Sequence, residues 1–188
     1  VQRFADEMKT RLPEVDRFLG LNDVERIIDA CDLSEEAFVP DLGPAVYLPG
    51  EDAGRILATT GASAYLKIAE GCDNPCAFCI IPMIRGAFRS RPIASLVREA
   101  GQLAQSGVRE VNLIAQDSTS YGSDIGEVGG LPGLLRALGR VEDLRWIRIL
   151  YAYPSKVTTR LMDAMAETER VVKYIDIPLQ HASRRVLT

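Results

Sequence analysis

Residues 64–79 read AYLKIAEGCDNPCAFC, and this stretch decides how the rest of the chain is read. Its first part, Ala64 to Ala69, is an apolar run of the length typical of a buried β-strand. The loop that follows, Gly71 to Cys79, holds three of the four cysteines of the chain within nine residues. The stretch therefore predicts a strand that delivers a cluster of thiols to its carboxyl end.

Three further apolar runs predict strands at Glu110 to Ala115, Trp146 to Tyr151 and Val172 to Pro178. The segments between them carry apolar residues on one helical face, namely Ile93, Leu96, Val97, Ala100, Leu103 and Ala104, then Leu131, Leu134, Leu135 and Leu138, then Leu161, Met162 and Met165. Repeated βα units imply parallel strands with helices outside, either in a doubly wound sheet or in part of a barrel.

In both architectures the chemistry lies at the carboxyl ends of the strands. The segments that follow the four predicted strands are 70–79, 116–121, 153–155 and 180–183. We expect these segments to share one face of the molecule.

The sequence before residue 62 has a different texture. Up to Asp32 its apolar residues recur at helical spacing, and residues 33–61 contain three prolines and read as a linker with a short strand at 55–60. The predicted division is therefore 1–61, a tail of a preceding domain plus a linker, and 62–188, the α/β core.

Composition narrows the function classes. The chain has 188 residues, a formal net charge of −4 and no run of about 18 apolar residues, so the sequence predicts no membrane span. Residues 1–54 hold 13 acidic against 5 basic side chains, and the remainder is mildly basic. A mixed solvated surface accounts for this balance better than nucleic-acid contact does. Clustered cysteines without secretory features predict a reducing, cytoplasmic compartment.

Three chemical interpretations fit Cys72, Cys76 and Cys79. They are buried structural thiols, they bind zinc, or they hold an iron–sulfur cluster. Zinc needs a fourth ligand, for which only Cys31 and His181 are available. A cluster on three thiolates instead leaves one iron open to a ligand that is not protein.

The C-x3-C-x2-C spacing, with Phe78 before the last cysteine, resembles the signature of radical S-adenosylmethionine (SAM) enzymes. The resemblance implies a partial βα barrel of about four parallel strands with outer helices. It also implies that Cys72, Cys76 and Cys79 ligate a 4Fe-4S cluster and that Phe78 lies beside the adenine. In that superfamily SAM binds the open iron through its amino and carboxylate groups, and its one-electron cleavage gives a 5'-deoxyadenosyl radical.

Longer stretches of sequence indicate which family within the superfamily the chain resembles. The run from Ala64 to Pro92 resembles the methylthiotransferase family, and LIAQDSTSYG (113–122) and RILYAYPSKV (148–157) are similar to its ribosomal-protein (RimO-type) branch. That branch places a methylthio group on the β-carbon of an aspartate in a small-subunit ribosomal protein. Implied partners are this substrate and an electron donor such as a flavodoxin or ferredoxin. A tRNA-modifying (MiaB-type) enzyme and a non-enzymatic structural metal-binding module remain the alternatives.

The same resemblance assigns further cofactor contacts. Gln116 and Asp117 fall where the superfamily binds the amino group of SAM, although a helix N-cap at Asp117 or Ser118 fits equally. Gln180 is expected at the ribose or carboxylate, with a buried structural amide as the alternative.

Other conspicuous residues have simpler interpretations. Arg85, Arg89 and Arg91 read as a solvated basic face that could attract an acidic substrate loop. Trp146 opens a strand and is expected in the core. Cys31 reads as an ordinary thiol.

The chain departs from the family pattern at both ends. Full-length methylthiotransferases carry an N-terminal domain with a second 4Fe-4S cluster, and the opening VQRFADEM resembles the segment after the last cysteine of that domain. The family barrel has six strands and a small β-barrel domain after it. The sequence is therefore expected to be a fragment, with the second cluster only in the missing domain.

Overall fold

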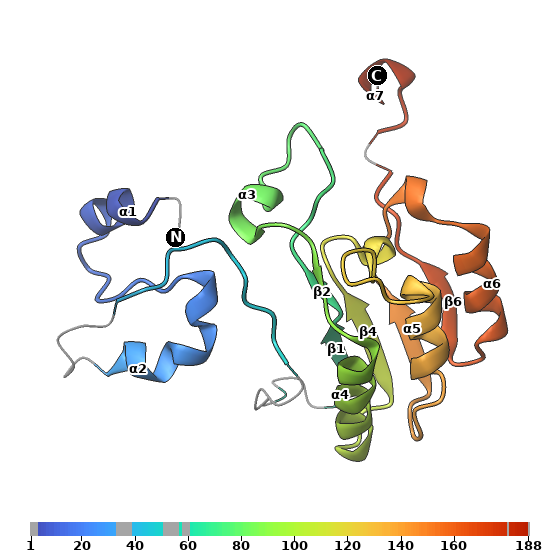
Figure 1. Cartoon of the computed structure of the whole chain (residues 1–188). Helices are drawn as coiled ribbons and strands as arrows, with labels where there is room; N and C mark the ends of the chain where they lie inside the picture. Colours follow the sequence, from blue (N-terminus) through green and yellow to red (C-terminus); the bar gives the residue numbers. More distant parts are fainter. Residues whose placement is uncertain (1–3, 33–38, 51–56, 58–60, 180, 188) are drawn as a thin grey trace. The chain divides into compact units, whose positions relative to one another are not determined.

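The computed structural model describes residues 4–32, 39–50, 57, 61–179 and 181–187. Its contacts separate two compact units (Figure 1). One comprises Val1–Leu48 and Gly71–Ala87, and the other comprises Pro49–Glu70 and Phe88–Thr188. The predicted strand at 55–60 lies almost wholly outside the described residues, and the predicted domain division at residue 61 stays a prediction.

The larger unit is built on a four-stranded parallel sheet. Its strands are β1 (Ser63–Lys67), β4 (Glu110–Ile114), β5 (Trp146–Ile149) and β6 (Val171–Ile175). They lie in the order β1-β4-β5-β6, with Ala64 opposite Val111 and Val111 opposite Ile147. Sequential order without a reversal is that of a barrel wall rather than of a doubly wound sheet. The expected α/β partial barrel is confirmed.

Three helices cover one face of this sheet, α4 (Ile93–Gln105), α5 (Gly130–Leu138) and α6 (Thr159–Glu167) (Figure 1). Their buried side chains include most of the predicted ones, namely Leu96, Ala100, Leu103, Ala104, Leu131, Leu134, Leu135, Leu138, Leu161 and Met165. Met162 is 48% exposed, so the expectation that it belongs to the core is wrong. The buried stripe of α6 runs through Ala164 instead, three residues before the helix ends at Glu167.

The face of the sheet opposite α4, α5 and α6 carries no helix among the described residues of the larger unit (Figure 1). Successive strand residues point to opposite faces, so Ala64 and Leu66 are buried under the helices while Tyr65 is 54% exposed. Trp146 is 53% exposed because it opens β5 on this second face, beside Glu110 in the register. The expectation that Trp146 is a core residue is therefore wrong.

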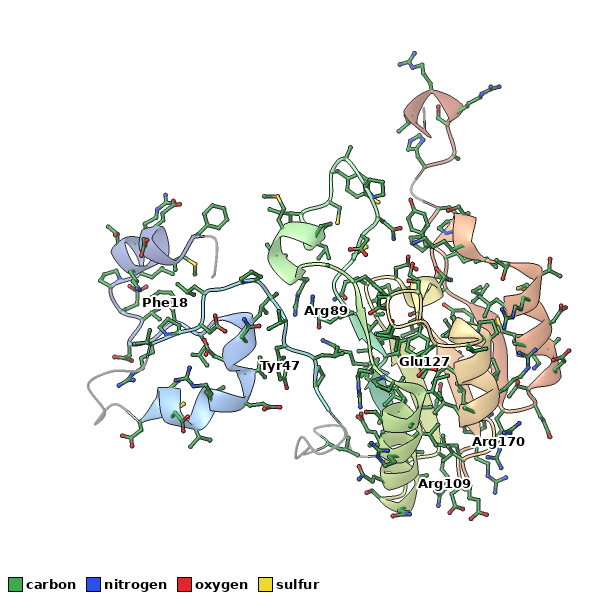
Figure 2. The ribbon with its side chains drawn as sticks, in the orientation of Figure 1. Phe18, Tyr47, Arg89, Arg109, Glu127 and Arg170 are labelled. Atoms are coloured by element: carbon green, nitrogen blue, oxygen red, sulfur yellow. The ribbon has the colours of Figure 1, made fainter. Side chains whose placement is uncertain are left out.

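Two arginines that precede strands donate hydrogen bonds to backbone carbonyl oxygens at the amino end of the sheet. Arg109, which precedes β4, donates to the carbonyl oxygen of Ala104 at 3.0 Å, in the last turn of α4 (Figure 2). Arg170, which precedes β6, donates to the carbonyl oxygen of Val141. For Arg109 this places a cationic group against the last turn of a helix, where positive charge is favourable.

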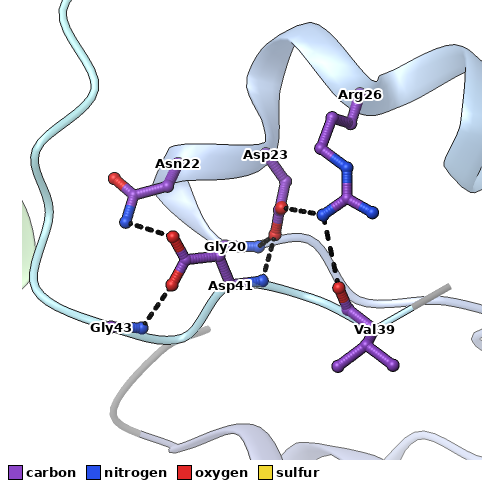
Figure 3. A network of polar contacts seen from close by, with 7 residues as sticks. All are labelled: Gly20, Asn22, Asp23, Arg26, Val39, Asp41 and Gly43. Carbon is purple, nitrogen blue, oxygen red and sulfur yellow. Dashed lines mark hydrogen bonds and ion pairs between the residues drawn. The ribbon is translucent and has the colours of Figure 1, made fainter.

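Within the smaller unit, α1 (Ala5–Arg11) is followed by the 3-10 helix η2 (Leu21–Arg26) and by α2 (Ile27–Cys31). A polar network joins η2 to the segment after residue 38 (Figure 3). The fully buried Asp23 carboxylate accepts from the backbone N–H groups of Gly20 at 2.9 Å and Asp41 at 2.8 Å, and from Arg26 at 3.0 Å. One carboxylate thus fixes two separate segments of backbone.

The same unit contains α3 (Ile81–Arg85), within the segment that carries the clustered cysteines. The last element, α7 (Arg184–Leu187), belongs to the larger unit. No helix among the described residues has the length and apolarity needed to cross a membrane.

Candidate active site

The cysteine-rich loop leaves one short strand and enters another. β2 (Ala69–Glu70) precedes it and β3 (Arg89–Ser90) follows it, and the two strands pair antiparallel. Within the loop, the N–H of Cys72 donates to the carbonyl oxygen of Gly86 at 3.3 Å. Gly71 has a φ of +79°, and a Cβ there would lie 2.1 Å from the carbonyl oxygen of Ala87. Only glycine fits this closure without displacing backbone.

The three clustered cysteines are free thiols of different exposure. Cys72 is buried, whereas Cys76 and Cys79 are partly exposed. The N–H of Cys79 donates to the carbonyl oxygen of Cys76 at 3.0 Å, which makes a turn between them, and Phe78 is 79% exposed. Three soft thiol donors on one short loop suit an iron–sulfur cluster. Across the described ranges no three His, Cys, Asp or Glu side chains form a ready-made metal site, so ligation by these thiols stays a prediction.

Asp117 lies in the loop after β4 and caps the 3-10 helix η3 (Ser118–Ser120). Its carboxylate is buried and accepts from the N–H of Thr119 at 3.0 Å and from the hydroxyl of Ser120 at 2.6 Å. Lys156 of η4 (Pro154–Lys156) forms an ion pair with it at 2.8 Å. Of the two roles left open for Asp117, the cap is the one that the structure displays.

These contacts tie the loops after two neighbouring strands together. Lys156 follows β5, and it reaches Asp117, which follows β4. Ser118 adds two more links, since its hydroxyl donates to the carbonyl oxygen of Leu150 at 2.6 Å and its N–H donates to that of Tyr151 at 3.0 Å. The segments 116–121 and 153–155 therefore share the carboxyl edge of the sheet, as expected.

Gln116 belongs to a second polar group at this edge. Its side-chain NH2 donates to Oε1 of Glu70 at 3.0 Å, and Lys67 forms an ion pair with Oε2 of the same carboxylate. Glu70 is only 6% exposed. The side-chain amide oxygen of Gln116, Oε1, is buried and accepts from no donor among the described residues. A buried acceptor without a partner is a feature that calls for a ligand or another explanation.

The strand that leaves the cysteine loop is anchored on the η3 side of the larger unit. Tyr121 is buried, and its hydroxyl donates to the carbonyl oxygen of Arg91 at 2.6 Å. Burial, followed by the nearby Glu127 carboxylate, raises the pKa of Tyr121, so its phenol stays protonated. Asp124 accepts from the N–H of Ser90 at 2.8 Å.

Beyond β3, Glu127 accepts from the N–H of Ile93 at 3.2 Å, at the start of α4 (Figure 2). Arg91 is buried and pairs with Glu99 at 2.6 Å. Arg91 is therefore not part of a solvated basic face, and that expectation is wrong for this residue.

Sequence reasoning missed three members of the site. Lys67, Glu70 and Lys156 are common charged residues, and only their contacts distinguish them. A signal was available for Glu70, because a charged side chain directly before the cysteine loop stands at the carboxyl end of a strand. Gln180, a predicted cofactor contact, lies outside the described residues.

Comparison with known proteins places the chain in a family. The sequence model of the radical SAM superfamily matches residues 66–188. The ribosomal protein uS12 methylthiotransferase RimO of Solibacter usitatus is 50% identical over 100% of this chain, which covers 40% of that protein. The protein of the same name from Thermoanaerobacter sp. is 46% identical over 99% of the chain, which covers 43% of it. The chain thus spans less than half the length of these curated relatives.

Solved structures agree on the fold. The radical SAM methyltransferase TsrM from Kitasatospora setae, bound to tryptophan and a SAM analogue, matches 68% of this chain and 24% of its own with a TM-score of 0.52. A second structure of TsrM, with cobalamin and a [4Fe-4S] cluster bound, gives a TM-score of 0.51. At 19% identity, both likenesses bear on the fold alone. The cysteine loop, the sequential parallel sheet and the match over residues 66–188 together lead to one conclusion: the chain belongs to the radical SAM superfamily.

Proposed function

We propose that this chain is the SAM-binding part of an enzyme that transfers a methylthio group to the β-carbon of an aspartate in ribosomal protein uS12. The observation that carries the proposal is the 50% identity, over the whole chain, to a protein named as the uS12 methylthiotransferase RimO. The stretches 113–122 and 148–157 support the protein-modifying branch over the tRNA-modifying one. Both stretches contribute to the carboxyl edge of the sheet through Asp117, Leu150 and Lys156.

Membership of the superfamily implies a 4Fe-4S cluster and SAM. We propose that Cys72, Cys76 and Cys79 hold the cluster and that Phe78 contacts the adenine. When bound, the cluster and SAM supply a carbon-centred radical, which no protein side chain offers and which an unactivated C–H bond requires. The chain's own task is to position both partners and keep water away.

Individual side chains suit that positioning task. The buried acceptor on Gln116 suits the amino group of SAM. Asp117 is already engaged by Thr119, Ser120 and Lys156, so its contribution is to hold the loop of Gln116 in place. Gln180 is proposed at the ribose or carboxylate on the strength of the family resemblance alone.

Other parts of the proposal concern the protein that carries this chain. A second 4Fe-4S cluster is proposed in the N-terminal domain of the longer relatives, and a flavodoxin or ferredoxin is proposed as the electron donor. Free thiols in a cluster site fit the reducing environment of the cytoplasm. Residues 1–61 are proposed as a tail of that domain with its linker, and residues 62–188 as the radical SAM core.

The test is a substrate assay with mass spectrometry. The protein carrying this chain is loaded with iron and sulfide without oxygen, then incubated with SAM and a reductant, and offered either small ribosomal subunits or tRNA. We expect a methylthio mass increase on one aspartate of uS12 and none on tRNA. A C72A variant should give neither product. A product on tRNA, with uS12 unmodified, would contradict the proposal.

A further inference from the structure

We infer that Glu70 and Lys67 are positioning residues that fix the orientation of the Gln116 amide, so that its oxygen is presented to the amino group of SAM. The inference rests on the proposed function and adds two residues to it. Three observations carry it: Gln116 donates to Glu70 at 3.0 Å, Lys67 occupies the other oxygen of the carboxylate, and Oε1 of Gln116 is buried without a donor among the described residues.

The first step concerns hydrogen-bond polarity. An amide side chain can present either its oxygen or its NH2 in a given direction, and the two orientations have nearly the same shape. An ionised carboxylate can only accept hydrogen bonds. Because the Glu70 carboxylate pairs with the Lys67 ammonium through one oxygen, its other oxygen accepts the NH2 of Gln116 and thereby directs the amide oxygen the other way.

The second step concerns what the oxygen faces. Oε1 of Gln116 has lost its access to water, and a buried acceptor without a donor is energetically unfavourable. A ligand that brings an N–H donor to this point regains that energy on binding. The amino group of SAM would be such a donor.

The third step concerns location. Glu70 is separated from Cys72 by a single residue, so their Cα atoms lie within about 7 Å of each other whatever the loop conformation. Gln116 is hydrogen-bonded to Glu70. The acceptor thus belongs to a residue that is hydrogen-bonded two positions before the first cysteine of the cluster loop.

The arrangement predicts the effect of E70Q in detail. Lys67 is a donor only, so it takes the oxygen of the new amide and leaves the NH2 of that amide facing Gln116. Gln116 must then turn its own oxygen inward and present NH2 to the ligand. Two donors would face each other, and we expect SAM to bind at least about tenfold more weakly, as for an unmatched buried hydrogen-bonding group.

A reciprocal exchange should restore binding. In the E70Q/Q116E double variant the amide at position 70 donates to the carboxylate at position 116, and the second carboxylate oxygen is again an acceptor facing the ligand. We expect SAM affinity to return to within about threefold of the parent, a difference below 1 kcal/mol. R136Q, which removes the exposed ion pair with Glu167, is the control for loss of an ion pair and should leave affinity unchanged.

Two ligands and one ligand-free measurement make the test specific. Binding to the cluster-loaded full chain is measured for SAM and for its analogue without the amino group, and the weakening by E70Q should be confined to SAM. In the unloaded protein, Q116E alone should lower the thermal midpoint because two carboxylates abut, and adding E70Q should restore it. Equal weakening for both ligands, unchanged binding in E70Q, or no rescue in the double variant would overturn the inference.

A parent protein that takes up the cluster but binds no SAM would mean that the proposed function itself fails. That result is distinguishable, because the thermal midpoints of the variants report on the amide orientation without any ligand. The inference about SAM would then fall with the function on which it rests.

Discussion

At the scale of single residues, the site depends on side chains and glycines whose local conformation admits few substitutes. Gly71 is one of them. Its positive φ and the nearness of the Ala87 carbonyl leave no room for a Cβ, and the residue stands directly before Cys72. We therefore expect the closure of the cysteine loop, and not the thiols alone, to decide whether the three proposed ligands are presented together.

We expect G71A to impair cluster loading. An alanine at this φ costs ~1–2 kcal/mol in backbone energy, before the clash with Ala87 is added. This corresponds to a roughly 5- to 30-fold smaller population of the closed loop. Iron bound per chain, measured at limiting iron against a chelator, should fall accordingly. G101A is the matched control because a Cβ there meets nothing within 4 Å, and equal loading in G71A and G101A would contradict this account.

At the scale of elements, short helices and loops are held by buried polar groups rather than by their own propensity. The 3-10 helix η3 is fixed by the Asp117 carboxylate, and η2 is fixed by that of Asp23. Neither element is long enough to be stable in isolation. In η2 and η3 a buried carboxylate thus has the role that buried apolar residues have in α4 and α5, which is to hold the element in place.

We expect D23A to release the segment around residue 41 from η2. The variant leaves the N–H groups of Gly20 and Asp41 without their acceptor, and for the buried Gly20 this costs about 1–3 kcal/mol. Amide hydrogen exchange at these two positions should accelerate by more than tenfold. E25A removes an exposed carboxylate of the same helix and should leave both rates unchanged, and similar rates in the two variants would refute the assignment.

At the scale of the whole molecule, periodicity predicted the parts of the fold that rest on burial. The four parallel strands and the buried faces of α4 and α5 follow from apolar spacing, because burial selects for it. The exposure of Trp146 was not predicted, because an aromatic residue suits the sheet face that carries no described helix of the larger unit as well as it suits the core. Sequential strand order, which separates a barrel from a doubly wound sheet, is a property of long-range pairing that no local pattern contains.

The candidate site was predictable only where spacing is itself the signal. The spacing of three cysteines on one loop predicts metal ligands. Glu70, by contrast, is recognisable only through its hydrogen bond with Gln116, and Lys67 only through its ion pair with Glu70. The central claim that unites these scales is that Cys72, Cys76 and Cys79 hold a 4Fe-4S cluster with one iron left for SAM.

The most direct test is Mössbauer spectroscopy of this 188-residue chain. The chain is loaded with iron-57 and sulfide without oxygen, and spectra are recorded before and after SAM is added. We predict one 4Fe-4S cluster per chain and a changed signal from a single iron when SAM binds. C72A, C76A and C79A should each lose the cluster, while C31A, which alters the exposed fourth cysteine, should keep it. A spectrum that SAM leaves unchanged, or a protein that retains stoichiometric zinc in place of iron, would contradict the account.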